Sequence, residues 1–71
     1  DYHARYNLAL AQYHLGDILW DVEPYQKSLE LFQLLVEQDP EDSHVHIDYA
    51  ITMVSFALLI QDNHQPETVQ E

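Results

Sequence analysis

The stretch from Tyr6 to Asp17, YNLALAQYHLGD, constrains the fold most, because its apolar residues occupy two adjoining faces of a helix. One face consists of residues at i, i+3, i+7 and i+11, namely Leu8, Ala11, Leu15 and Leu19. A second apolar set lies beside it and consists of Tyr6, Ala9, Leu10 and Tyr13. A helix with two apolar faces is expected to contact two neighbours. The stretch therefore predicts stacked helical hairpins, with the small Ala9 and Ala11 allowing a close approach.

Three helices are predicted to account for most of the chain, because no β-type alternation persists and there are only one glycine and three prolines. Gly16 need not end the first helix, since an internal glycine costs only about 1 kcal/mol relative to alanine. Pro24 is expected at the first position of the second helix, and Pro40 is expected to end that helix. The predicted helices cover residues 2–20, 24–38 and 44–61.

The third predicted helix is apolar on nearly every side and is therefore expected to be buried. One of its faces consists of Val45, Tyr49, Met53 or Thr52, Phe56 and Ile60. Another consists of Ile47, Ile51, Val54 and Leu58. Two preceding helices cannot cover both faces, so we expect either self-association or a further covering element. The apolar run 49–60 is too short to span a bilayer, and we expect no membrane insertion.

The net charge of the chain argues against polyanionic partners. Thirteen Asp and Glu residues against two Lys and Arg residues give a formal net charge of −11, which opposes binding to nucleic acid and to anionic membranes. The acids either keep an apolar chain soluble or attract a basic partner. The chain has no cysteine, which favours a reducing, cytoplasmic setting. Its 71 residues form one small domain or a piece of a larger protein.

The pattern of residues resembles a tetratricopeptide repeat. The first helix and turn of that repeat are similar to Tyr6-Asn7-Leu8-Ala9, Tyr13, Leu15 and Gly16-Asp17. Its second helix and closing proline are similar to Ser28, Phe32, Leu35 and Asp39-Pro40. Residues 43–55 resemble the opening helix of a second repeat, with Tyr49-Ala50 at the place of Leu8-Ala9. The resemblance covers roughly residues 4–60 and implies an all-α fold, an antiparallel helical hairpin plus a third helix. We expect this unit to comprise residues 1–62 and the polar tail 63–71 to be frayed or the start of a truncated helix.

The repeat differs from the family in length. Leu8 and Pro40 are 32 positions apart, where a repeat of about 34 residues allows roughly 25. The excess of about seven residues falls around 18–25, and about seven residues make two helical turns. Longer helices and a long loop are the two alternatives. We favour longer helices, because Ile18, Leu19 and Trp20 are too apolar for an exposed loop.

The resemblance implies a groove, lined by the first helices of successive repeats, that receives a segment of a partner protein. The groove positions are Tyr6, Leu10, Tyr13 and His14 from the first helix, and Ile47, Ile51 and Val54 from the third. These side chains are mostly apolar or aromatic, so the expected partner is a hydrophobic or amphipathic segment. The alternative is that they form the core of a bundle or an interface between identical chains. A clamp for a partner's terminal carboxylate is not expected, because Arg5 and Lys27 are the only Lys or Arg residues.

No catalytic, metal or cofactor site is predicted. The chain has five histidines, but His44 and His46 lie about 200° apart around a helix and cannot chelate one ion. His44 and Asp48 are spaced as an i, i+4 pair, although two ligands do not complete a site. The carboxylates fall mainly at helix ends, where they are suited to capping. We therefore expect a protein that is not an enzyme and that needs no cofactor.

Overall fold

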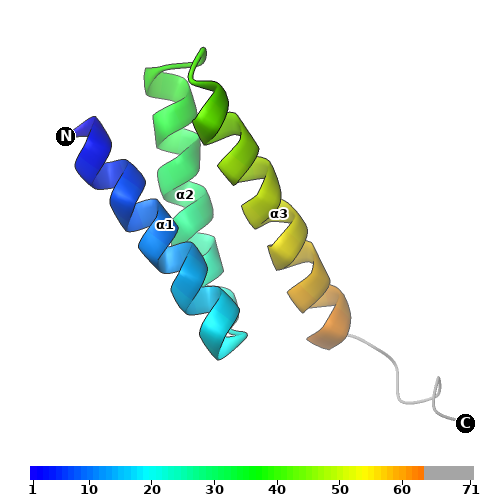
Figure 1. The fold of residues 1–71 in the computed structure, drawn as a ribbon. Helices are drawn as coiled ribbons and strands as arrows, with labels where there is room; N and C mark the ends of the chain where they lie inside the picture. The colour runs from blue at the N-terminus through cyan, green and yellow to red at the C-terminus, as the bar shows by residue number, and fades with distance from the viewer. Residues whose placement is uncertain (64–71) are drawn as a thin grey trace, which may run out of the picture.

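The structure, a computed structural model, describes residues 1–63 and consists there of three α-helices. They are α1 (Tyr2–Leu19), α2 (Val22–Gln38) and α3 (Ser43–Asn63). Figure 1 shows α1 and α3 running in the same direction and α2 running back between them. The main packing is of α2 against both of its neighbours, and α1 contacts α3 much less. The predicted all-α fold, a helical hairpin plus a third helix, is confirmed. The predicted tail lies outside the described residues, apart from Asn63.

The connection between α1 and α2 consists of only two residues, Trp20 and Asp21, which confirms that the extra length belongs to the helices. Trp20 ends α1 in the left-handed conformation, with φ 53° and ψ 52°, and its backbone N–H bonds to the carbonyl of Gly16. The side chain of Asp21 accepts from the backbone N–H of Glu23 and begins α2. Pro24 was expected at the first position of α2 and instead stands at the third, which is still in the turn where no backbone donor is needed.

Gly16 lies inside α1 because Tyr25 of α2 packs directly against it. A β-carbon at Gly16 would lie 2.9 Å from the Cδ2 atom of Tyr25 and 3.0 Å from its Cγ atom. The Tyr25 side chain is fully buried, and its hydroxyl donates to Asp17. The glycine therefore serves the close approach of two helices near their connecting turn, and it does not end α1.

The core lies at the other end of the helices and joins all three of them. Its fully buried apolar residues are Ala9, Phe32, Leu35 and Val45. The hydroxyl of Ser28 donates a 2.8 Å hydrogen bond to the backbone carbonyl of Ala9, so the buried Ser28 is satisfied. Tyr49 stacks on Phe32 with ring centroids 6.2 Å apart, which extends the core onto α3.

The turn between α2 and α3 is held by carboxylates. Asp39 follows the last residue of α2, and its side chain accepts from the backbone N–H of Glu41. Asp42 stands directly before α3 and accepts from the backbone N–H groups of His44 and Val45, as a helix-capping residue does. The predicted stop at Pro40 and the predicted capping by this acidic segment are both confirmed.

Two predicted buried faces are exposed in the structure. On α3, the fully buried residues are Val45, Thr52 and Leu59, so Thr52 and not Met53 lies on the packed face. The expectation that α3 is buried is therefore wrong for the isolated chain. The expectation that two helices cannot cover both faces of α3 is confirmed. On α1, the set that packs contains Ala9 with Tyr6 and Leu10, and the face predicted first is uncovered: Leu8, Ala11, Leu15 and Leu19.

Candidate functional site

The three predicted groove residues of α3 form an uncovered apolar stripe. The side chains of Ile47, Ile51 and Val54 are 57%, 46% and 60% exposed, and Leu58 continues the series at 53%. Their positions, i, i+4, i+7 and i+11, place them on one line along the helix. We call these four residues the α3 stripe. Their spacing is that of the apolar face with which an amphipathic helix contacts a partner.

The predicted groove residues of α1 are largely occupied within the chain. Tyr6 and Leu10 are half-buried and pack against the core. Tyr13 is half-buried and meets Tyr25 edge to face, with ring centroids 6.1 Å apart. His14 is exposed, and its ring lies 5.1 Å from that of Tyr13. The alternative interpretation, that the predicted groove residues are core residues, therefore applies to Tyr6 and Leu10 on α1. The predicted groove residues of α3 lie outside the core and are exposed.

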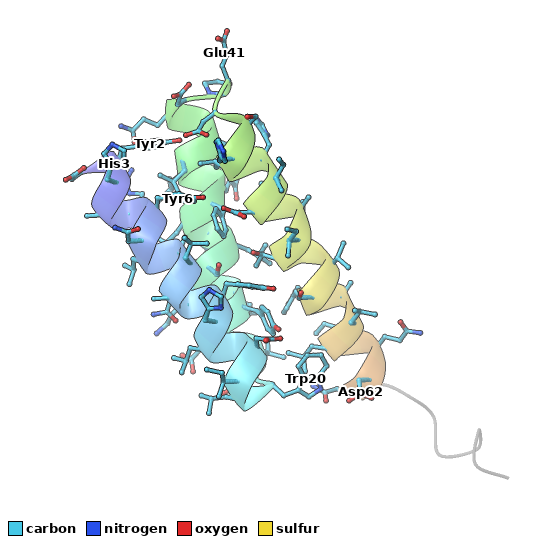
Figure 2. All side chains as sticks on the ribbon, viewed as in Figure 1. Tyr2, His3, Tyr6, Trp20, Glu41 and Asp62 are labelled. Atoms are coloured by element: carbon cyan, nitrogen blue, oxygen red, sulfur yellow. The ribbon has the colours of Figure 1, made fainter. Side chains whose placement is uncertain are left out.

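A line of hydrogen bonds joins the α1 side of the molecule to α3. Each has an aromatic donor and a carboxylate acceptor, and Figure 2 labels the three donors, Tyr2, Tyr6 and Trp20, and the acceptor Asp62. The hydroxyl of Tyr6 donates to Asp48, and Nε1 of Trp20 donates to Asp62 over 3.1 Å. At the start of both helices, the hydroxyl of Tyr2 donates to the capping Asp42 over 2.9 Å. These bonds fix α3 beside α1 with the α3 stripe directed away from α2.

The hydrogen bonds of this line and partial burial shift the pKa values of its tyrosines and of Asp42. The hydrogen bond to Asp48 and partial burial raise the pKa of Tyr6 to about 12. Burial and the hydrogen bond to Asp42 raise the pKa of Tyr2 to about 12 as well. The Tyr2 hydrogen bond, with the backbone N–H groups of the capped helix, lowers the pKa of Asp42. At neutral pH these tyrosines therefore remain neutral donors, and Asp42 carries its charge.

The two cationic side chains lie elsewhere. The guanidinium of Arg5 donates to the side chain of Gln38 on α2 over 3.1 Å. The ammonium of Lys27 lies 3.9 Å from the carboxylate of Glu23 on the same helix, and both groups are exposed. Neither cation has an ion pair with Asp48 or Asp62 in the described part of the chain.

The histidines and the remaining acids have local roles. Among residues 1–63, no group of three or more His, Asp and Glu side chains is arranged to hold a metal ion. Of the two residues spaced as an i, i+4 pair, His44 lies 4.0 Å from Asp42, and Asp48 accepts from Tyr6. His46 forms a 2.6 Å hydrogen bond with the carbonyl of Pro40 and so closes the turn before α3.

A second exposed apolar surface lies on α1 and was not predicted as a site. It consists of Leu8, Leu15, Ile18 and Leu19, which we call the α1 outer face. The sequence signal for it was the i, i+3, i+7, i+11 series that predicted a contact with a neighbouring helix. The contacts of Asp48 and Asp62 with aromatic donors were not predicted either, because hydrogen bonds between side chains 42 positions apart leave no local pattern.

By length and composition, α3 would also be able to cross a membrane, and it is the only such helix in the described part of the chain. The run 49–60 is short, but the whole helix has 21 residues, or about 31 Å. Buried core helices of water-soluble proteins satisfy the same criterion, although α3 is mostly exposed in this chain. The absence of membrane insertion therefore stays a prediction.

No family model, no curated protein and no solved structure is significantly similar to this chain. The function is therefore argued from the geometry described above.

Proposed function

We propose that this chain is a protein–protein interaction scaffold of tetratricopeptide-repeat type, which binds a hydrophobic or amphipathic segment of a partner through the α3 stripe. The observation that carries the proposal is the exposure of Ile47, Ile51 and Val54, together with Leu58, on one line of α3. Four large apolar side chains, each about half exposed, gain free energy when a partner covers them, at about 25 cal/mol per Å² of apolar surface. Exposed apolar surface of this extent is typical of interaction sites.

The type of scaffold is supported by the packing of the residues that carry the resemblance. Ala9, Ser28 and Phe32 are fully buried, which suits the small and aromatic positions at which the helices of such a repeat pack together, whereas the buried Leu35 is bulky where a small residue is usual. The hydrogen bond from Ser28 to the Ala9 carbonyl requires a close approach of α1 and α2. Tyr13 and His14 stand at the α1 edge and would contact the outer side of the bound segment.

Selection of helical peptides from a displayed library on the immobilised chain tests this function. We expect recovered peptides to lose binding to Ile51→Ser and to keep binding to Leu34→Ser and Leu15→Ser. The three side chains are matched in exposure, at 46%, 47% and 43%, but lie on α3, α2 and α1. Retained binding to Ile51→Ser, or loss on all three variants, would contradict the proposal.

The second candidate function is self-association. It is favoured by the α1 outer face, which gives the molecule a second apolar surface distinct from the α3 stripe. Contact between two different surfaces of identical chains is heterologous and leads to rings or open chains of subunits. A molar mass that rises with concentration, and that returns to the monomer value in Leu15→Ser, would support this candidate.

A further inference from the structure

The two borders of the α3 stripe differ in charge. On the α1 side stand Asp48 and Asp62, each oriented by an aromatic donor from α1 or its cap. On the other side stand exposed, uncharged residues, Ala50, Ala57 and Gln61. The stripe is therefore an apolar strip with one acidic edge and one uncharged edge.

The acidic edge keeps its charge. The hydroxyl of Tyr6 and the indole N–H of Trp20 are neutral donors, so they orient the carboxylates without neutralising them. Arg5 and Lys27 contact groups on α2 instead. Each carboxylate oxygen has more than one acceptor site, so a carboxylate bound by one aromatic donor is still able to receive an ammonium or guanidinium group.

The net charge of the chain favours a basic partner over a second copy of the chain as the occupant of the stripe. A second copy of this chain carries the same net charge of −11, so self-association at the stripe would bring two strongly acidic molecules together. A basic partner would be attracted over the whole approach and would match the acidic edge on contact. Asp48 and Asp62 are 14 residues apart on α3, a rise of about 21 Å, so a partner helix of four turns reaches both.

We propose that the segment bound by the α3 stripe is a cationic amphipathic helix, with its apolar face on Ile47, Ile51, Val54 and Leu58 and its Lys or Arg residues along the Asp48–Asp62 edge. This inference rests on the proposed function and specifies the chemistry of the partner. The apolar contact supplies the affinity, and the acidic edge fixes which side of the partner helix faces α1.

Three synthetic helices of about 18 residues test the inference. All have the same leucine face, and their polar positions are lysine, glutamine or glutamate. In low-salt buffer we expect the leucine–lysine helix to bind about tenfold more tightly than the leucine–glutamine helix, since two rim charge pairs are each worth up to about 1 kcal/mol. In about 1 M NaCl, where the Debye length is about 3 Å, the difference should largely disappear.

Asparagine variants locate the effect. Asp48→Asn and Asp62→Asn keep an acceptor for the Tyr6 and Trp20 donors and remove the charge, so we expect each to reduce the preference for lysine over glutamine by a few fold. Glu30→Gln, on the exposed face of α2, removes the same charge away from the stripe and should leave the preference within twofold. Equal losses in all three variants would show a general attraction to an acidic protein and would overturn the acidic-edge assignment.

The remaining outcomes separate the two proposals. Equal binding of the three helices would overturn the inference and leave the proposed function standing. Binding of none of them, by a chain that is monomeric, would contradict the function itself. A dimer whose formation is abolished by Ile51→Ser, or insertion of α3 into neutral phosphatidylcholine vesicles, would assign the stripe to a second copy or to a membrane and would overturn the inference.

Discussion

The hydroxyl of Tyr6 on α1 donates its hydrogen to the carboxylate of Asp48 on α3, and so connects the first helix to the third across 42 positions of sequence. The same carboxylate stands one residue from Ile47, at the start of the α3 stripe. The bond therefore has two roles, since it sets the position of α3 and holds an acidic group at the edge of the proposed binding surface.

Tyr6→Phe is expected to destabilise the fold by about 1 kcal/mol, because a hydrogen bond to a half-buried carboxylate is lost while the ring is kept. Urea unfolding followed by circular dichroism measures the change. Tyr13→Phe is the matched control, since Tyr13 is also half-buried and its hydroxyl makes no hydrogen bond within the described residues. Its effect should stay within about 0.5 kcal/mol. Similar effects of the two variants would contradict the assigned role of Tyr6.

Alkaline titration tests the same contacts. In the folded chain the pKa values of Tyr2 and Tyr6 are raised from 10.0 to about 12, because the hydroxyls donate to carboxylates and are partly removed from water. The unfolded chain releases these protons first, so their stabilising contribution is complete below about pH 10 and is lost as the pH rises to about 12. Ultraviolet absorbance of the phenolates should show Tyr2 and Tyr6 titrating late, together with Tyr25, whose pKa is also raised by burial. Ionisation of all five near pH 10 in a folded chain would contradict the contacts.

Gly16→Ala is expected to destabilise the fold although alanine favours a helix. The added β-carbon would lie 2.9 Å from the ring of the fully buried Tyr25. Overpacking of this kind costs about 1–3 kcal/mol, against a gain of about 1 kcal/mol in helix propensity. Thermal unfolding should show a lower midpoint, and adding Tyr25→Leu should recover part of the loss. A higher midpoint for Gly16→Ala alone would show that α1 and α2 are further apart at this point.

Substitutions on α3 should separate the stripe from the packed face. Ile51→Ser exchanges a half-exposed side chain and should change the free energy of unfolding by less than about 1 kcal/mol. Leu59→Ala empties a fully buried position on the packed face of α3 and should cost about 2–5 kcal/mol. Chemical denaturation compares the two variants. Unfolding of the chain by Ile51→Ser would place Ile51 in the core and remove it from the binding surface.

The fold was largely predictable because periodic and local signals carried it. Three signals act within a few residues of where they appear: the helical recurrence of apolar residues in α1 and α2, the acids before each helix, and the stop at Pro40. The excess of about seven residues, together with the apolar residues 18–20, correctly predicted longer helices. The left-handed backbone conformation of Trp20 was not predictable, because the residue that ends a helix in this conformation is usually a glycine. In this conformation the indole of Trp20 donates to the distant Asp62 and its ring contacts Tyr25.

The candidate site was predictable in part. Apolar periodicity placed Ile47, Ile51 and Val54 on one face, but periodicity does not tell which of two apolar faces a neighbour covers. On α1 the face with Leu8 and Leu15 is exposed, and the face with Ala9 is packed, because the small Ala9 permits the close contact with Ser28. The acidic edge depends on contacts between distant residues and required the structure.

The most direct measurement is a map of amide and methyl NMR shifts as the leucine–lysine helix is added to the chain. The account predicts the largest changes at Ile47, Ile51, Val54 and Leu58, with smaller ones along the Asp48–Asp62 edge. The α1 outer face and Leu34 of α2 should be unchanged. Changes centred on Leu8 and Leu15, or spread evenly over all exposed leucines, would contradict the claim that the α3 stripe is the site at which this chain binds its partner.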